Sequence, residues 1–412
     1  MVKGTRYTLF VAALILLVAL TLTACAGTPG PAGPPGPAGP AGPEGPAGPV
    51  GEPAEAVSLE PEYIGSEVCQ GCHEDTFATF MQSGHPYKLI AVVDGQPPEY
   101  PFSEVPEPPE GYTWDDITYV IGGYGWKARF IDQQGYIITG DAEATTQYNL
   151  FNEDLGQGDR WVAYNAGKEN YVYNCGSCHT TGYSDWPPDS HQNDLPGLIG
   201  TWALDGIQCE ACHGPASLHV ANPGNELLRP EVNRDSQLCG SCHLRGDPAQ
   251  IDAKGTFIQH HEQYEEFYQT KHRALECVDC HNPHATTLYR NNPDVTVSGI
   301  AVECANCHWE QATFQPEGHT APTCLDCHMA RLAKSAEGNE ARLRADVPSH
   351  LFSINPYATE QFFAGANDTL FSYGFITLPY ACSSCHYEGG GARTLTFEQA
   401  QAFAIGYHDR DR

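Results

Sequence analysis

Methionine is scarce in this sequence, and so are basic residues. The 412-residue chain has three methionines, and its 21 lysines and arginines face 51 aspartates and glutamates, which gives a formal net charge of −30. Such an acidic chain is not a nucleic-acid binder, because the phosphate backbone requires clustered positive charge. The charge favours solubility and contact with cationic partners or surfaces.

Long hydrophobic runs are also missing, apart from one near the N-terminus. The apolar stretch Tyr7–Leu22 follows the basic Lys3 and Arg6 and ends shortly before Cys25. It is short for a membrane span, and small residues before a cysteine resemble a bacterial lipoprotein box. We therefore expect residues 1–24 to be a signal peptide and Cys25 to be lipidated. An ordinary signal peptide and an uncleaved anchor helix are the weaker alternatives.

The segment after the signal has a glycine at every third position. From Gly27 to Pro53 it reads GTPGPAGPPGPAGPAGPEGPAGPVGEP, the collagen pattern, in which only glycine fits at the axis of three wound chains. A single-chain polyproline II spacer explains the pattern equally well. Either alternative predicts a stiff tether of roughly 80 Å at about 3 Å per residue. We assign residues 25–56 to this tether and residues 57–412 to the body.

No cysteine of the body stands alone. All of them form Cys-x-x-Cys pairs, and a histidine follows each pair directly. Zinc sites use such pairs with variable flanks, redox dithiols need no adjacent histidine, and disulfides give no reason for one. Cys-x-x-Cys-His is the attachment signal of c-type haem, so eight haem c groups with proximal histidine ligands are expected. The motifs are Cys69–Cys72–His73, Cys175–Cys178–His179, Cys209–Cys212–His213, Cys239–Cys242–His243, Cys277–Cys280–His281, Cys304–Cys307–His308, Cys324–Cys327–His328 and Cys382–Cys385–His386.

The scarcity of methionine restricts the second axial ligand of each iron. Met1 leaves with the signal peptide and Met329 directly follows a proximal histidine, so Met81 alone remains. Methionine ligation raises haem potentials, whereas histidine on both sides is expected here and keeps them low. Of the 18 histidines, eight are proximal, which leaves ten candidates. These are His85, His191, His219, His260, His261, His272, His284, His319, His350 and His408.

Local sequence separates some of these candidates. Phe77, Met81 and His85 are four residues apart, which predicts one helical face. The C-terminal segment that ends at His408 begins with a capping box and is expected to be helical. His261 is adjacent to a second histidine, so only one of that pair is expected to face a haem. His191 is interpreted as a solvated loop residue.

Several short motifs resemble a known family. "SGHP", "CEACHGP" with a later histidine, "CHNPH", "CLDCHM" and "SHLF" are similar to motifs of multihaem c-type cytochromes, which include the tetrahaem cytochrome of ammonia oxidisers, hydroxylamine oxidoreductase and octahaem relatives. The resemblance covers most of residues 69–350 as separate motifs. It implies closely stacked haems. It also implies distal ligand roles for His85, His219, His272, His284, His319 and His350, with the iron of each left open.

The position of His284 predicts which iron it can reach. His284 lies one helical turn beyond the proximal His281, and it would have to cross the porphyrin plane to reach the distal side of the same iron. We therefore expect His284 to bind the iron of a neighbouring haem.

The fold class is expected to be mainly α, with long loops and a small β region at about residues 112–175. A haem-free, β-rich insert should occupy about residues 90–170, where strand formers and glycines alternate. Residues 94–111 are proline-rich and acidic, which predicts a surface loop. Lys127 and Arg129 of the insert are interpreted as structural, and no catalytic residue is assigned.

The leading hypothesis is electron transfer along eight haems in an exported protein, lipid-anchored at the outer membrane or cell surface. Its expected partners are other redox proteins, membrane quinol-linked donors, an extracellular acceptor and further copies of the chain, which would associate through the collagen-like segment or through haem stacking. The alternative is an octahaem oxidoreductase of nitrite, hydroxylamine or tetrathionate. That enzyme needs an iron with an open site, and the haem at His179, beside Tyr183, is a candidate.

Overall fold

The computed structural model describes residues 60–409, apart from 260–262, 314–318 and 320–321. The predicted signal peptide, lipidation site and tether lie outside the described residues, as do His260 and His261. The described residues belong to one compact unit. Within the described ranges, no helix is long and apolar enough to cross a bilayer.

All helices of the described residues are short. The longest, α14, has eight residues, and isolated helices of fewer than about 12 residues are marginal in water, so tertiary packing must hold them. The helices are α2 (Ser66–Gln70), α3 (Glu74–Phe80), α4 (Gly176–His179), α5 (Cys209–His213), α6 (Ser217–Ala221), α7 (Ser236–Gly240), α8 (Gln263–Tyr268), α9 (Cys277–Cys280), α10 (Cys304–Cys307), α11 (Trp309–Ala312), α12 (Cys324–His328), α13 (Leu378–Cys382) and α14 (Phe397–Ala404).

A seven-stranded sheet forms in the haem-free stretch, as the alternation of strand formers predicts. All of its strand pairs are antiparallel, and its main path runs β1-β2-β3-β4-β7, with β5 joining β3 and β6 joining β5. The strands are β1 (Leu89–Ala91), β2 (Ile117–Gly122), β3 (Lys127–Asp132), β4 (Tyr136–Ile137), β5 (Gln147–Asn149), β6 (Arg160–Val162) and β7 (Tyr171–Val172).

This sheet is covered on both faces. In β2, Tyr119 and Ile121 belong to one apolar cluster, and Val120 belongs to another. Successive side chains of a strand point to opposite faces, which explains the division. Cys175 packs against the first cluster. The sheet therefore holds the second haem motif in place.

A second, six-stranded sheet corrects the expected fold class. Its order is β13-β12-β11-β10-β16-β15, and it lies outside residues 112–175, so the strands are not confined to the predicted small β region. Two of its pairings, β10 with β16 and β11 with β12, join segments far apart in the sequence, which local patterns do not reveal. They are β10 (Ile251–Lys254), β11 (Phe257–Gln259), β12 (Ala333–Asn339), β13 (Arg344–Val347), β15 (Phe362–Ala364) and β16 (Leu370–Ser372). Two small pairs complete the strands: β8 (Thr180–Thr181) with β9 (Leu204–Asp205), and β14 (Ile354–Asn355) with β17 (Ile376–Thr377).

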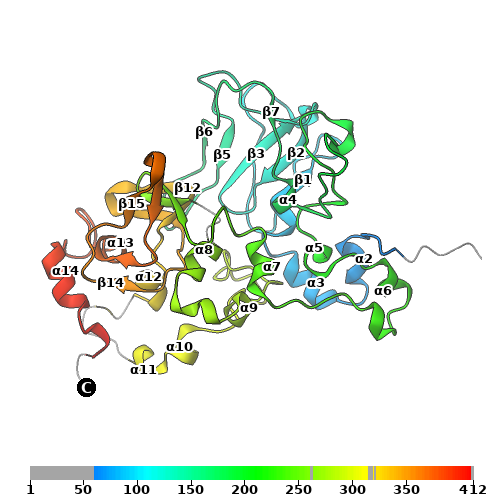
Figure 1. Ribbon diagram of the computed structural model, residues 1–412. Helices are drawn as coiled ribbons and strands as arrows, with labels where there is room; N and C mark the ends of the chain where they lie inside the picture. Colours follow the sequence, from blue (N-terminus) through cyan, green and yellow to red (C-terminus); the bar gives the residue numbers. More distant parts are fainter. Residues whose placement is uncertain (1–59, 260–262, 314–318, 320–321, 410–412) are drawn as a thin grey trace, which may run out of the picture. The chain divides into compact units, whose positions relative to one another are not determined.

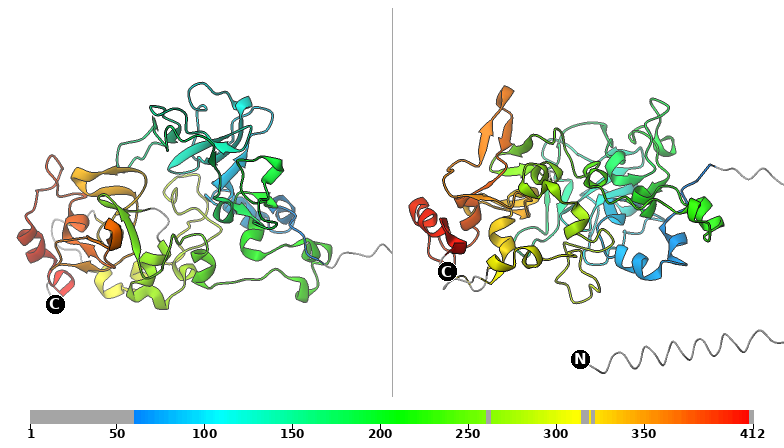
Figure 2. Two further views of the ribbon diagram at one scale, coloured as in Figure 1. Left: turned by 45° about the horizontal axis from the view of Figure 1, so that its top comes forward. Right: turned by 60° about the horizontal axis from the view of Figure 1, so that its bottom comes forward.

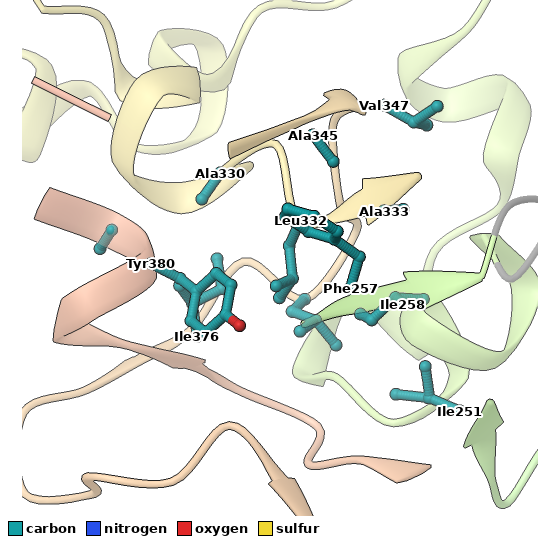
Figure 3. Close-up of a cluster of buried hydrophobic side chains, with 12 residues drawn as sticks. Ile251, Phe257, Ile258, Ala330, Leu332, Ala333, Ala345, Val347, Ile376 and Tyr380 are labelled. Carbon is teal, nitrogen blue, oxygen red and sulfur yellow. The ribbon is translucent and has the colours of Figure 1, made fainter. Parts of the chain in front are cut away.

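The core of the second sheet positions the last haem motif. Figure 3 shows Leu332 and Phe257 of the sheet region facing Ile376 and Tyr380. Tyr380 lies in α13, and Cys382 at the end of that helix packs against the same cluster. The hydroxyl of Tyr380 donates to the carbonyl of Thr256 at 2.7 Å, which ties the helix to the turn between β10 and β11.

The motif helices follow one another across the molecule. In Figure 1, α7, α9 and α10 lie between the N-terminal helices α2, α3 and α5 and the C-terminal helices α12, α13 and α14. The two further views of Figure 2 show the same progression from blue through green and yellow to red. The segments that carry the haem motifs are thus arranged in series.

Candidate haem sites and their histidine ligands

Each haem motif is built on about one helical turn. Residues three and four apart lie on the same helix face, so the spacing brings both thiols and the imidazole together. In the first motif, the backbone N–H of His73 donates to the carbonyl of Cys69 at 2.9 Å, and His243 bonds Cys239 in the same way at 2.9 Å. The local sequence alone therefore assembles the attachment group.

The cysteines of all eight motifs are free thiols. The described residues form no disulfide bond in this structure. The same residues contain no group of three or more His, Cys, Asp or Glu side chains arranged to hold a metal ion. The thiols are available for thioether bonds.

One large cavity connects the motifs. Its volume is about 3560 Å³, and at least one cysteine from seven of the eight motifs lines it. A pocket for one small molecule has roughly 300–1,000 Å³. Paired free thiols, histidines and an interior of this size fit a set of c-type haems, which would supply one-electron redox chemistry through their irons.

The structure brings six proximal histidines together with six candidate distal histidines. In each pair, one ring follows a Cys-x-x-Cys and the other comes from outside that motif. The distances between ring centres are 6.5 Å for His243 and His85, 6.1 Å for His213 and His284, 6.0 Å for His308 and His272, 6.0 Å for His281 and His350, 6.0 Å for His386 and His319, and 5.9 Å for His328 and His408.

This spacing has a physical meaning. Two imidazoles that bind one iron from opposite sides have ring centres roughly 6 Å apart, because each metal–nitrogen bond is about 2.0 Å and each nitrogen lies about 1 Å from its ring centre. The six pairs leave room for one iron each. His284 lies opposite His213, with the ring planes 8° apart, and not opposite its own His281.

Hydrogen bonds fix the orientation of several proximal rings. A backbone carbonyl or amide oxygen that accepts from Nδ1–H leaves the Nε2 lone pair for a metal. The acceptors are Lys88 O for His179 at 3.1 Å, Glu231 O for His213 at 2.7 Å, Gln263 Oε1 for His243 at 3.2 Å, Phe352 O for His328 at 2.7 Å and Arg393 O for His386 at 2.6 Å.

Burial keeps the enclosed rings neutral. It lowers the pKa of His85 to about 3 and the pKa of His350 to about 3, and with the nearby Lys88 ammonium it lowers the pKa of His179 to about 4. A histidine must be unprotonated to bind a metal. These rings are therefore ready for iron at neutral pH.

Two distal candidates reach their places differently from the sequence prediction. Helix α3 ends at Phe80, and His85 lies beyond it, before the short 3-10 turn Pro86–Lys88. The capping box of Thr396 and Gln399 is confirmed, but α14 ends at Ala404, and His408 stands on the following turn. Glycines follow both helical stretches in the sequence, and they end the predicted patterns early.

His73 and His179 remain without a paired ring. Neither lies in ring contact with another histidine in the part of the chain that the structure describes. His219 is half-buried, and its Nδ1 has no hydrogen-bond partner there. His191 is also half-buried, and its Nδ1 donates to the carbonyl of Leu198 at 2.8 Å. The interpretation of His191 as a solvated loop residue is wrong, because its backbone forms a β-bridge with Gly200 and its ring is hydrogen-bonded.

Basic side chains gather near His179. The positive charges of Lys88, Arg129 and Lys127 each lower the pKa of His179. Burial lowers the pKa of Lys88 to about 8 and that of Lys127 to about 7. The guanidinium of Arg129 lies 3.6 Å from the ring centre of Tyr164. No sequence pattern singles out Lys88, which ends the short turn Pro86–Lys88.

A buried carboxylate that the sequence did not single out supports one distal ligand. The backbone N–H of His350 donates to Glu266 Oε2, and the His350 Nδ1 lies 3.9 Å from the same oxygen. Burial raises the pKa of Glu266 to about 8. The carboxyl group thus anchors the segment that carries His350.

Comparison with known proteins agrees with these features. The family described as "Cytochrome c554 and c-prime" matches residues 162–214, which contain two of the haem motifs. The "Multiheme cytochrome MtrA" of Shewanella baltica (strain OS185) is 26% identical over 138 residues, 30% of this chain and 36% of that protein. The match thus spans about a third of that relative's length.

Two solved structures are similar in fold. The octaheme sulfite reductase MccA of Wolinella succinogenes superposes with a TM-score of 0.53 at 18% identity, over 84% of this chain and 67% of that one. The Outer Cell Wall Cytochrome OcwA gives a TM-score of 0.47 at 19% identity, over 84% and 86%.

The repeated attachment motifs and these similarities are those of haem-carrying redox proteins. The chain is similar to multihaem c-type cytochromes. Its likeness to hydroxylamine oxidoreductase remains a prediction.

Proposed function

We propose that the chain transfers electrons through eight covalently attached haems, at least six of which have histidine on both sides of the iron. The six histidine pairs carry this proposal, since their spacing is that of two ligands on one metal. Bis-histidine irons are closed to substrates and suited to electron transfer. The predicted lipid anchor and tether would hold this body outside the membrane of the cell envelope.

His219 is the proposed distal ligand of the haem at His73. The hydroxyl of Ser217, in the helix of His219, accepts the backbone N–H of Glu62 at 2.8 Å, and Ala216 N–H donates to Glu210 at 2.9 Å. Glu210 in turn accepts the N–H of Gly65 at 2.9 Å, just before the first motif helix. These contacts tie α6 to the start of α2.

Low-temperature electron paramagnetic resonance of the oxidised, haem-loaded protein tests the assignment. We expect low-spin ferric signals from the six pairs and from the haem at His73. The haem at His179 should add one high-spin signal. A spectrum dominated by high-spin haem would contradict the electron-transfer proposal, because the histidine pairs would then not ligate iron.

A second function is favoured by the surroundings of His179, namely reduction or oxidation of a small oxyanion at that haem. No described histidine pairs with His179, and the basic groups of Lys88, Arg129 and Lys127 interact with it. In a chain of net charge −30 this local positive charge is unusual, and it would attract anions such as nitrite or sulfite. An entirely low-spin spectrum would remove this candidate, since His261 or another ligand would then close the site.

Replacing Lys88 by methionine should weaken anion binding at the His179 haem. The loss of one buried charge-assisted contact is expected to raise the apparent dissociation constant of nitrite or sulfite roughly tenfold or more. The measurement is the shift of the high-spin signal on titration with each anion. Lys254→Met, at an exposed position on β10, serves as the matched control and should leave the titration unchanged. Equal affinities in the two variants would show that Lys88 has no part in such a site.

A further inference from the structure

The side chain of Phe352 lies between the distal ligands proposed for two different haems. Its ring centre is 4.5 Å from that of His272, the distal candidate for the haem at His308. It is 5.9 Å from the ring centre of His350, the distal candidate for the haem at His281, and these two rings meet edge to face at 87°. One aromatic ring therefore contacts the axial ligands of two irons.

The backbone of Phe352 contacts a ligand of a third haem. Its carbonyl oxygen accepts the Nδ1–H of the proximal His328 at 2.7 Å. His328 faces its own distal candidate, His408, at 5.9 Å between ring centres. An acceptor at Nδ1 fixes the orientation of the imidazole and makes it a stronger donor to a metal. Phe352 thus contacts one ligand from each of three haem motifs that follow one another in the sequence.

An unusual backbone conformation accompanies these contacts. The φ angle of Phe352 is +55°, in the left-handed region that bulky residues rarely adopt. The N–H of Ser353 donates to the carbonyl oxygen of Leu351 at 2.6 Å, which closes a three-residue turn centred on Phe352. A turn of this size with a positive φ at its centre is the rare and strained form. Such a conformation persists only where its surroundings enforce it.

The residues on either side of Phe352 hold the turn in place. Leu351 is fully buried in the core of the second sheet. The carbonyl oxygen of Ser353 accepts the N–H of Ile376 at 2.7 Å, which fastens the turn to β17. Phe352 itself is half-buried and lines the large cavity that connects the haem motifs. The strained turn therefore places the ring at the cavity wall while its neighbour stays in the core.

We propose that Phe352 is a positioning residue for three irons, and that it sets the reduction potentials of the haems at His281, His308 and His328. This inference rests on the proposed bis-histidine ligation and electron transfer. The ring orients two distal imidazoles and shields them from water, and the carbonyl orients one proximal imidazole. A protein tunes haem potentials through hydrogen bonds to the ligands and through the polarity around them.

Loss of the ring and loss of the carbonyl contact have opposite expected effects. A ferric haem carries one more positive charge than the ferrous form, so entry of water stabilises the ferric state and lowers the potential. Loss of the acceptor at Nδ1 makes the proximal imidazole a weaker donor, which destabilises ferric iron and raises the potential. The direction of each shift therefore shows which contact was lost.

Two substitutions in the haem-loaded full chain separate the contacts. Phe352→Gly removes the ring but suits a positive φ, so the turn and the carbonyl contact with His328 remain. Redox titration followed by low-temperature electron paramagnetic resonance should show lower midpoints and altered low-spin signals for the haems at His281 and His308, and an unchanged midpoint at His328. Phe352→Val also disfavours the turn, because a β-branched residue is strained at positive φ, and should in addition raise the midpoint at His328.

Phe80→Leu is the matched control. Phe80 is also a phenylalanine beside one distal candidate, with its ring centre 6.3 Å from that of His85. Its replacement should affect the haem at His243 and leave the other midpoints in place. Each low-spin signal is assigned beforehand by replacing the distal histidine of its haem with alanine.

The outcomes distinguish this inference from the ligation on which it rests. An unchanged midpoint at either His281 or His308 in Phe352→Gly would overturn the positioning role, and so would equal shifts in Phe80→Leu. A midpoint at His328 that falls together with the other two in Phe352→Gly would contradict the separate action of the carbonyl. Wild-type protein without low-spin signals would instead overturn the proposed bis-histidine ligation itself.

Discussion

Replacing His284 by alanine is expected to convert one haem, that of His213, from low-spin to high-spin ferric iron. The rings of His213 and His284 are parallel within 8°, and their centres are 6.1 Å apart. Among the described residues, His284 is the histidine whose ring faces that of His213. Removing one axial ligand opens a coordination position and weakens the ligand field. Electron paramagnetic resonance should lose one low-spin signal and gain one high-spin signal, which carbon monoxide binding to the reduced protein would confirm optically.

His191→Ala is the matched control for this prediction. His191 is also a half-buried histidine with an oriented ring, but no proximal histidine contacts it in the described part of the chain. Its removal should leave every low-spin signal in place. If the haem at His281 changed instead in His284→Ala, the ligand would act within its own motif, and the proposed link between haems would be wrong.

The sequence was sufficient for the attachment groups because their geometry is local. Cys277, Cys280 and His281 fall on one helical turn whatever surrounds them, and the same is true of the other motifs. That His284 does not face its own proximal His281 also followed from local geometry. Its partner His213 did not, because nothing near either residue specifies which distant turns meet.

The pairing of motifs depended on buried polar contacts that have no periodic signature. Ser66 and Ser236 are small polar residues in ordinary positions, and only the fold shows that each accepts an N–H from another motif. Lys88 looked equally ordinary, yet it lies beside His179. The contacts of such residues depend on which distant segments meet in the fold, and neither composition nor motif spacing predicts that.

The second sheet was missed for a related reason. β10 pairs with β16 across a long stretch of chain, and Ile251 opposes Ser372 in that ladder. Most strands of this sheet have three or four residues and carry too few alternations to stand out, and the seven-residue β12 reads AKSAEGN, which is poor in strand formers. The seven-stranded sheet was predictable because β2 and β3 are rich in strand formers over six residues each.

A chain in which haem attachment is blocked should not fold to this structure. The interior cavity of about 3560 Å³ would have to stay empty or fill with water. The apolar side chains that line it would lose their contacts with the haems, and a domain stability of about 5–15 kcal/mol cannot absorb the loss of eight such cofactors. Urea titration followed by near-ultraviolet circular dichroism should show a cooperative transition for the haem-loaded protein and none for the unloaded chain.

One region should survive the loss of haem better than the rest. The seven-stranded sheet has apolar clusters on both faces, with Phe130 and Ile131 fully buried on opposite sides. Most motif helices belong to no apolar cluster, and at four or five residues they cannot persist alone. Limited proteolysis of the unloaded chain should therefore leave a fragment that contains β2 to β7 and digest the stretch from α8 to α11. Uniform digestion would show that this sheet also depends on the haems, through the contact of Cys175 with its core.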